Sequence, residues 1–178
     1  MKKIKNILFF CGIVTILFSF ASCKNKPEGA VIVSNFEISK YLGSWSEIAR
    51  LDHSFERGMT NTTAEYTLNE DGSVKVLNRG YITDKEKWNT AEGIAKFRGE
   101  ANIGELKVSF FGPFYGGYNI IELDPDYNYA LVAGPNLKYL WILARTTTIP
   151  ENIKTQYLNT AQTLGYAIEE LIWVEHDK

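Results

Sequence analysis

The feature that most constrains this chain is a series of short β-like runs, nearly evenly spaced and separated by turn residues. Apolar and polar residues alternate within many of the runs, as they do in strands with one buried face. An Asp71-Gly72 turn joins two of the alternating runs, which is a strong signal for a hairpin. The expected strands cover residues 44–51, 62–68, 73–82, 88–98, 105–111, 117–123, 129–133 and 139–145.

A series of antiparallel strands leaves two exposed edges unless it closes on itself. Closure into an up-and-down barrel removes both edges and needs only short turns. We therefore predict an all-β fold, an eight-stranded antiparallel up-and-down β-barrel or calyx. A barrel of this size is just wide enough to enclose one small ligand.

One α-helix is expected after the barrel. Thr148 is a candidate cap, Pro150 and Glu151 suit the first turn, and Gly165 suits the end. An apolar stripe recurs at helical spacing between them, at Ile153, Tyr157, Ala161 and Leu164. We expect this stripe to pack on the outside of the barrel, with residues 171–174 as a short final strand alongside.

The N-terminal region has the pattern of an export signal. Three lysines precede an apolar run over residues 7–21, which is shorter than the roughly 20 residues that span a bilayer. Cys23 follows two small residues, as in a bacterial lipobox, in which the cysteine becomes the lipidated N-terminus. An ordinary secretory signal with an incidental cysteine is the alternative. We divide the chain into a lipoprotein signal peptide (1–22), a lipidated Cys23 with a tether (23–33) and one domain (34–178).

Several function classes are disfavoured by composition. The formal net charge is −2 and no basic cluster is present, so a nucleic-acid partner is not expected. No metal-ligand spacing or catalytic motif occurs, and we predict no metal, no cofactor and no enzyme activity. His53, with Asp52 and Glu56, is the best acid–base cluster, and we interpret it as a solvated loop at the open end.

The motifs together resemble the lipocalin family. Gly43-Ser44-Trp45 matches the Gly-x-Trp signature on the first strand, and Arg145 matches the arginine at the end of the eighth strand. The stretches 55–58, 108–119 and 139–143 are similar to the bacterial outer-membrane lipoprotein lipocalins, an apolipoprotein D-like group. The resemblance covers residues 23–174.

The resemblance implies a protein that stores or transports a fatty acid or lysophospholipid at the bacterial outer membrane and supports envelope lipid maintenance. It leaves open which membrane face the protein occupies and whether the chain forms a homodimer. Gly43, Trp45 and Arg145 would be structural, with Trp45 closing one end and Arg145 lying on its indole face. The alternatives are a lipid-modifying enzyme with His53 as base, a haem or pigment carrier, and a structural lipoprotein whose barrel is filled by its own side chains.

Strand alternation predicts which residues face the interior. Trp141 shares a face with Arg145 in the eighth run, and the small residues Gly80, Gly93 and Ala95 should leave room for a void. Strands five to seven carry apolar residues on both faces, so their orientation stays ambiguous. The predicted ligand-binding residues are Trp141, Tyr115, Tyr139, Phe97, Val76, Asn78, Phe110 and Asn119. From the resemblance, Tyr115 and Trp141 are the strongest candidates, and the aromatic hairpin around Tyr115 is either a barrel rim, a ligand contact or a subunit interface.

Overall fold

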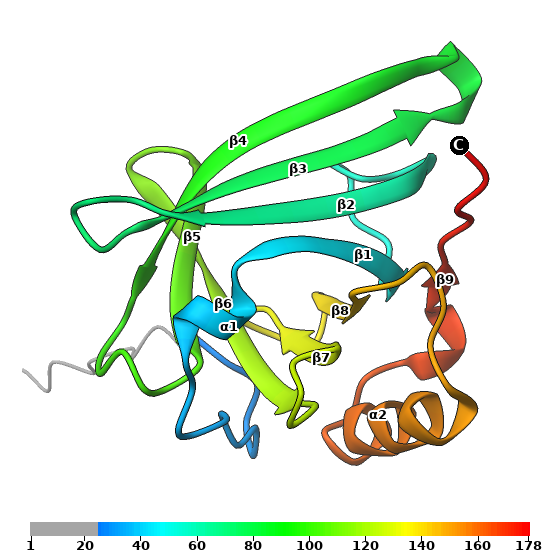
Figure 1. The fold of residues 1–178 in the computed structure, drawn as a ribbon. Coiled ribbons are helices and arrows are strands. Elements are labelled where there is room, and N and C mark those ends of the chain that lie inside the picture. The colour runs from blue at the N-terminus through cyan, green and yellow to red at the C-terminus, as the bar shows by residue number, and fades with distance from the viewer. Residues whose placement is uncertain (1–24) are drawn as a thin grey trace, which may run out of the picture.

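The computed structural model describes residues 25–178 (Figure 1). The predicted signal peptide and the lipidation site at Cys23 lie outside the described residues. No helix within residues 25–178 combines the length and the apolar character that a bilayer crossing requires.

Eight antiparallel strands close into a barrel, which confirms the predicted fold class. Each strand pairs with the next along the chain, and β1 pairs with both β8 and β2 to complete the cylinder. The barrel strands are β1 (Gly43–Arg50), β2 (Met59–Leu68), β3 (Val74–Ile82), β4 (Lys87–Phe97), β5 (Glu105–Phe111), β6 (Phe114–Leu123), β7 (Tyr129–Ala133) and β8 (Leu140–Ala144). The antiparallel order places the β1–β2, β3–β4, β5–β6 and β7–β8 connections at one end of the barrel.

Most strand bounds agree with the prediction within a residue or two, and two strands begin earlier. β2 begins at Met59 because its first residues continue the ladder with β3, where Met59 pairs with Ile82. β6 begins at Phe114 and includes Gly116 and Gly117, which pair with β5 although paired glycines usually indicate a turn.

The helix α2 (Glu151–Thr163) packs on the outside of the barrel with Tyr157 and Ala161 buried, as its apolar stripe predicts (Figure 1). Thr148 is not its cap, because Pro150 occupies the N-cap position in an extended conformation and no side chain caps the helix. The final strand β9 (Ile172–Trp173) pairs with the end of β1, and its two residues lie within the predicted segment. The short 3₁₀ helices η1 (Thr83–Lys85) and η2 (Ile168–Glu170) were not predicted.

The segment before the barrel is more ordered than a tether. Val33 donates a backbone hydrogen bond to Ile120 (3.0 Å) and accepts one from Gly104 (3.0 Å). Ala30 is buried on the barrel surface. A short helix, α1 (Ile38–Tyr41), which the sequence did not indicate, then leads into β1.

The C-terminal residues fill a gap between β1 and β2, which pair only over the first half of β1. Val174 donates its backbone N–H to Ile48 O (3.0 Å), and His176 Nε2 lies 2.9 Å from Glu47 O. The tail therefore covers the backbone around Glu47, whose side chain faces the barrel interior.

Two apolar clusters divide the core, and they resolve the orientation of strands five to seven. Along β7, Ala130 and Val132 belong to the cluster inside the barrel, whereas Leu131 and Ala133 belong to the cluster beneath α2. β5 and β6 likewise direct one set of side chains inward, including Leu106. The apolar residues on both faces of these strands thus serve a cavity wall and a helix-covered outer layer.

Candidate functional site: a cavity closed at one end

Trp45 closes one end of the barrel. The indole is fully buried and donates from Nε1 to Tyr41 O at 2.8 Å. The guanidinium carbon of Arg145 lies 3.9 Å from the centre of the indole ring, which is the stacking that the sequence predicted. A cation on an indole face contributes about 0.5–2 kcal/mol.

The Arg145 guanidinium is also held by three backbone carbonyls. Nη1 donates to Ser44 O (2.8 Å), Nη2 to Lys40 O (2.8 Å) and Nε to Tyr127 O (3.2 Å). These bonds join α1, β1 and the β6–β7 turn to the end of β8. Gly43 has a φ of +87°, a left-handed conformation that disfavours any side chain at this signature position.

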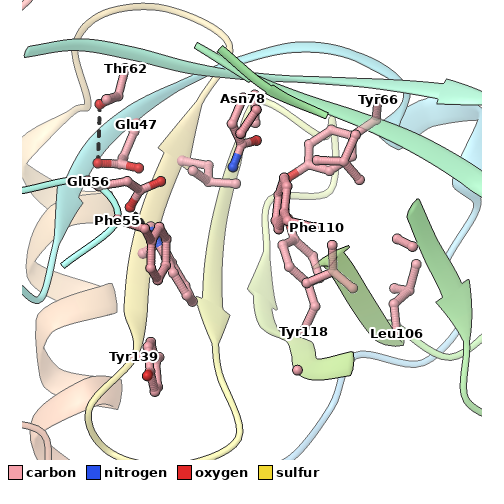
Figure 2. Close-up of a pocket in the computed structure, with 18 of the residues that line it drawn as sticks. Glu47, Phe55, Glu56, Thr62, Tyr66, Asn78, Leu106, Phe110, Tyr118 and Tyr139 are labelled. Carbon is pink, nitrogen blue, oxygen red and sulfur yellow. Dashed lines mark hydrogen bonds between the residues drawn. The ribbon is translucent and has the colours of Figure 1, made fainter. Parts of the chain in front are cut away.

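A cavity of about 530 Å³ occupies the interior above this plug (Figure 2). Its volume falls within the roughly 300–1,000 Å³ typical of small-molecule sites. The wall is mainly apolar, and its inward-facing residues come from seven of the strands. Among them are Ala64, Val74, Val76, Ala91, Ala95, Leu106, Val108, Phe110 and Leu143. The barrel is therefore hollow, which is not the filled structural barrel considered as an alternative.

Three tyrosine hydroxyls meet at the inner end of the cavity. Tyr118 OH lies 2.7 Å from Tyr41 OH and 2.8 Å from Tyr66 OH. All three side chains contribute to the cavity wall. Burial raises the pKa of each of the three phenols, so they are neutral at physiological pH.

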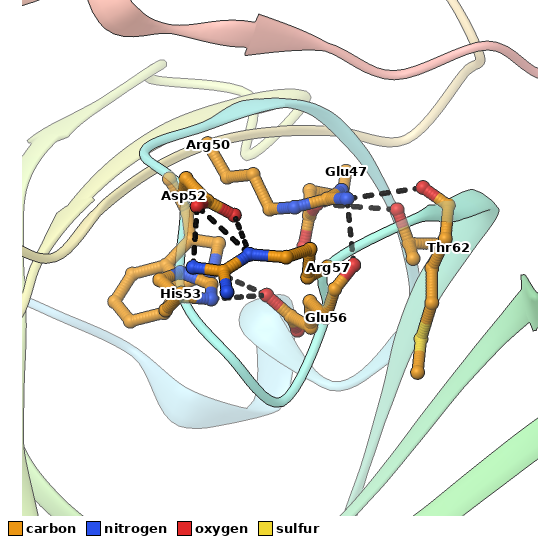
Figure 3. Close-up of polar contacts among 9 residues, drawn as sticks. Glu47, Arg50, Asp52, His53, Glu56, Arg57 and Thr62 are labelled. Atoms are coloured by element: carbon orange, nitrogen blue, oxygen red, sulfur yellow. Dashed lines mark hydrogen bonds and ion pairs between the residues drawn. The ribbon is translucent and has the colours of Figure 1, made fainter.

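A buried ion pair lies at the open end, between Glu47 and Arg50 (Figure 3). Arg50 Nη1 donates to Glu47 Oε1 at 2.5 Å, and Thr62 Oγ1 donates to the same oxygen at 3.2 Å. The other guanidinium nitrogen, Nη2, donates to the backbone oxygens of Glu56 (2.8 Å) and Met59 (3.0 Å). Inward-facing Glu47 therefore has a charged partner on its own strand.

Glu56 adds a second buried carboxyl beside the pair. Trp141 Nε1 donates to Glu56 Oε2 at 3.2 Å, and His53 Nδ1 lies 3.2 Å from the same oxygen. Burial, with the nearby charge of Glu47, raises the pKa of Glu56 to about 8. Burial, with the charge of Arg50, lowers the pKa of His53 to about 4. At neutral pH, both groups are therefore uncharged.

The interpretation of His53 as part of a solvated loop is wrong. His53 is only 6% exposed, because its ring stacks on Phe55 at 4.3 Å and lies 5.0 Å from the Trp141 ring. Asp52 is exposed and pairs instead with Arg57 (2.6 Å). Within residues 25–178, no group of three or more His, Cys, Asp or Glu side chains could hold a metal ion.

Exposed aromatic side chains flank the open end. Phe111 and Phe114, on either side of the β5–β6 turn, are 82% and 80% exposed, and both also contribute to the cavity wall. Phe55 in the β1–β2 loop is 53% exposed and lines the same cavity.

The structure brings most of the predicted ligand-binding residues to the cavity. Trp141, Tyr139, Val76, Asn78 and Phe110 all line it.

Three predicted residues lie elsewhere. Tyr115 points outward from β6, where Lys107 Nζ lies 4.9 Å from its ring centre. Phe97 packs edge-on against Phe36 (6.3 Å) near the closed end. Asn119 is fully buried outside the cavity, where its Nδ2 donates to backbone oxygens of Asn25, Ala133 and Gly134.

Of the three small residues predicted to leave a void, Gly80 and Ala95 line the cavity, and the two glycines also allow close packing. A Cβ on Gly93 would lie 2.8 Å from Phe110 Cδ1, and one on Gly80 would lie 2.7 Å from Thr62 Cγ2. Each glycine therefore lets a neighbouring side chain lie against the strand. The cavity results from the width of the barrel and from the small residues Ala64, Ala91 and Ala95 in its wall.

The sequence reasoning did not select Tyr66, Glu56 or Met59 for the cavity. Alternation along β2 places Tyr66 on the same face as Thr62 and Ala64, so this signal was available. Glu56 lies in the irregular β1–β2 loop, and Met59 is the first residue after it. Residue alternation does not predict where side chains of such a loop point.

This fold and site define a class: a calyx with one end plugged by a tryptophan–arginine stack, one end open, and an apolar cavity between them. A family model for the lipocalin-like domain matches residues 36–176. The chain belongs to the lipocalin family.

Relatives agree with this assignment. The chain is 49% identical to the outer membrane lipoprotein Blc of Citrobacter freundii, over 95% of this chain and 97% of the relative. It is 49% identical to the protein of the same name from Vibrio cholerae, over 86% and 90% of the two chains. Insecticyanin from Manduca sexta, 20% identical, shares the fold with a TM-score of 0.66 over 86% of this chain and 85% of its own.

The relatives also establish the protein's class and location. The protein is a ligand-binding lipocalin, lipid-anchored at the outer membrane.

Proposed function

We propose that this lipocalin binds a single fatty acid or lysophospholipid and stores or transports it at the outer membrane. The hollow, mainly apolar cavity of about 530 Å³, open at one end, is the observation that carries this proposal. An acyl chain of 16 carbons gains about 12 kcal/mol when buried, at roughly 0.8 kcal/mol for each methylene. Costs of association and chain ordering leave an affinity that is about micromolar or somewhat tighter.

The polar cluster at the open end suits a headgroup that remains near water. Arg50 neutralises Glu47, while Glu56 and His53 are uncharged at neutral pH. An anionic headgroup therefore meets no net negative charge there. We expect this cluster to set headgroup selectivity and to contribute little affinity.

The proposed lipid anchor begins near the open end. Asn119 Nδ2 donates to Asn25 O (2.9 Å), which holds residue 25 against β6, five residues along the strand from exposed Phe114. Cys23, the predicted lipidation site, is two residues earlier in the sequence. We propose that the open end faces the bilayer, with Phe111 and Phe114 in its interface, so that ligand enters from the membrane.

A matched pair of substitutions on β4 tests the cavity. Ala91→Phe adds a ring to the cavity wall, whereas Thr90→Phe adds the same ring to the exposed face of the strand. We expect Ala91→Phe to weaken stearic acid binding at least about tenfold, equivalent to 1.4 kcal/mol, and Thr90→Phe to leave it unchanged. Equal affinities in both variants, or no binding of any long-chain lipid to the unmodified protein, would refute the proposal. Native mass spectrometry of the protein from its own envelope reports the ligand mass and tests for a homodimer.

A further inference from the structure

The three tyrosine hydroxyls at the inner end of the cavity have more O–H protons than hydrogen-bond contacts among themselves. Tyr41, Tyr118 and Tyr66 form a linear series with two contacts, of 2.7 and 2.8 Å. Each neutral phenol carries one O–H proton. Two contacts use two protons, and within residues 25–178 the structure gives these hydroxyls no other hydrogen bond. One donor therefore remains unmatched in every arrangement of the protons.

The unmatched donor lies at the cavity wall, within reach of a ligand that fills the cavity. All three tyrosines contribute to the cavity wall, and Tyr41 also packs on the plug, 4.7 Å between ring centres from Trp45. A water molecule in the cavity can accept a hydrogen bond from the third O–H group. A plain acyl chain that displaces this water leaves the donor unsatisfied, and displacing an ordered water without replacing its hydrogen bonds reduces affinity.

The chemistry of this position favours a neutral acceptor. Burial raises the pKa of the phenols, so none of them ionises at physiological pH. The nearest cation, Arg145, lies behind the Trp45 ring and is bound to three backbone carbonyls. A buried carboxylate needs a charged partner or several donors, which this position does not offer.

We propose that the Tyr41–Tyr118–Tyr66 triad binds a hydroxyl or keto oxygen within the acyl chain of the ligand, remote from its headgroup. The inference rests on the proposed function and adds to it a preference for oxygenated acyl chains. The headgroup stays with the Glu47–Arg50–Glu56 cluster at the open end. Figure 2 shows Glu47 and Glu56 across the cavity from Tyr66 and Tyr118.

Titration with stearic acid and with a series of hydroxystearic acids that differ in hydroxyl position tests this inference. We expect one position to bind about tenfold more tightly than stearic acid, equivalent to 1.4 kcal/mol, and the other positions to bind equally or more weakly. Equal or weaker binding of every hydroxystearic acid would overturn the inference while the proposed function stands. No binding of either type of acid would instead overturn the proposed function.

The combined variant Tyr41→Phe, Tyr66→Phe and Tyr118→Phe removes the three oxygens and keeps the rings. It should bind stearic acid at least as tightly as the unmodified protein and lose the preference for the hydroxylated chain. Tyr157→Phe is the matched control, because this tyrosine is buried on the face of α2 that packs on the barrel, outside the cavity, and its hydroxyl has no hydrogen bond. A preference that survives in the combined variant would overturn the inference. If that variant does not fold, the positional series on the unmodified protein decides alone.

Discussion

The two ends of the barrel use the same pair of residue types for different purposes. At the closed end, Arg145 stacks on Trp45 and donates only to backbone carbonyls. At the open end, Arg50 pairs with a carboxylate and Trp141 donates to a second carboxyl, that of Glu56. The closed end thus has a fixed charge held by three backbone carbonyls, which is suited to a permanent plug. The open end buries groups that can change their charge, which is suited to contact with a ligand headgroup.

The comparison predicts the largest loss of stability at the plug. Trp45→Ala removes a fully buried indole and the stacking surface of Arg145. We expect the free energy of unfolding to fall by about 3–5 kcal/mol, measured by urea denaturation. Trp88→Ala is the control, because Trp88 is 39% exposed yet also has an arginine, Arg79, 3.8 Å from its ring. Equal losses in the two variants would show that the plug has no special structural role.

Removal of the open-end cation should be the next largest effect. Arg50→Met leaves Glu47 buried without its charged partner. Breaking a buried pair on one side costs about 3 kcal/mol or more, and the loss should shrink at low pH as Glu47 becomes protonated. Arg57→Met removes the exposed pair with Asp52 and should cost less than about 1 kcal/mol. Denaturation of both variants at pH 5 and pH 7 checks this, and a loss independent of pH would contradict it.

A smaller effect is expected from the titration of Glu56, whose pKa is raised from 4.5 to about 8 on folding. Between these values the folded state holds a proton that the unfolded state has lost, so stability falls as pH rises. The pKa of His53 is lowered from 6.5 to about 4 on folding, so its titration makes stability rise with pH below pH 6.5. This rise offsets the effect of Glu56 in that range.

The net fall in stability should therefore appear between pH 6.5 and 8, where Glu56 contributes about 1.5 kcal/mol. Glu56→Gln keeps an acceptor for Trp141 and removes the titration. Urea denaturation across this range should give a flatter pH dependence for the variant. The same slope in both proteins would show that Glu56 does not titrate in this range.

The difference between the two ends also explains what the sequence could predict. Strand alternation and the Gly-x-Trp signature located Trp45, Arg145 and Trp141 correctly, because regular strands fix the side of each side chain. The open end depends on the β1–β2 loop, where no periodicity applies. The burial of His53 and Glu56 depends on rings that Phe55 and β8 bring over them, and such contacts between distant segments have no local signature.

Tyr115 illustrates a second limit. The resemblance and the aromatic hairpin both indicated Tyr115, but its neighbours Phe114 and Gly116 are the residues that line the cavity. A register irregularity between Val108 and Phe111 alters the alternation in this hairpin. An extra residue of this kind shifts the inward and outward positions that follow it, and the pattern of a single strand does not reveal it.

The smallest effect on stability, with a clear effect on function, is expected at the exposed phenylalanines beside the open end. The combined variant Phe111→Ser and Phe114→Ser changes side chains that are 82% and 80% exposed, so the free energy of unfolding should change by less than about 0.5 kcal/mol. The bilayer-facing arrangement predicts that this variant takes up a fluorescent fatty acid from vesicles more slowly, with unchanged affinity for the acid in solution. Leu68→Ser, at the other end of the barrel and 46% exposed, is the control and should leave the uptake rate unaltered. An uptake rate that is the same in all three proteins would mean that ligand reaches the cavity through water, and the open end would then need no contact with the membrane.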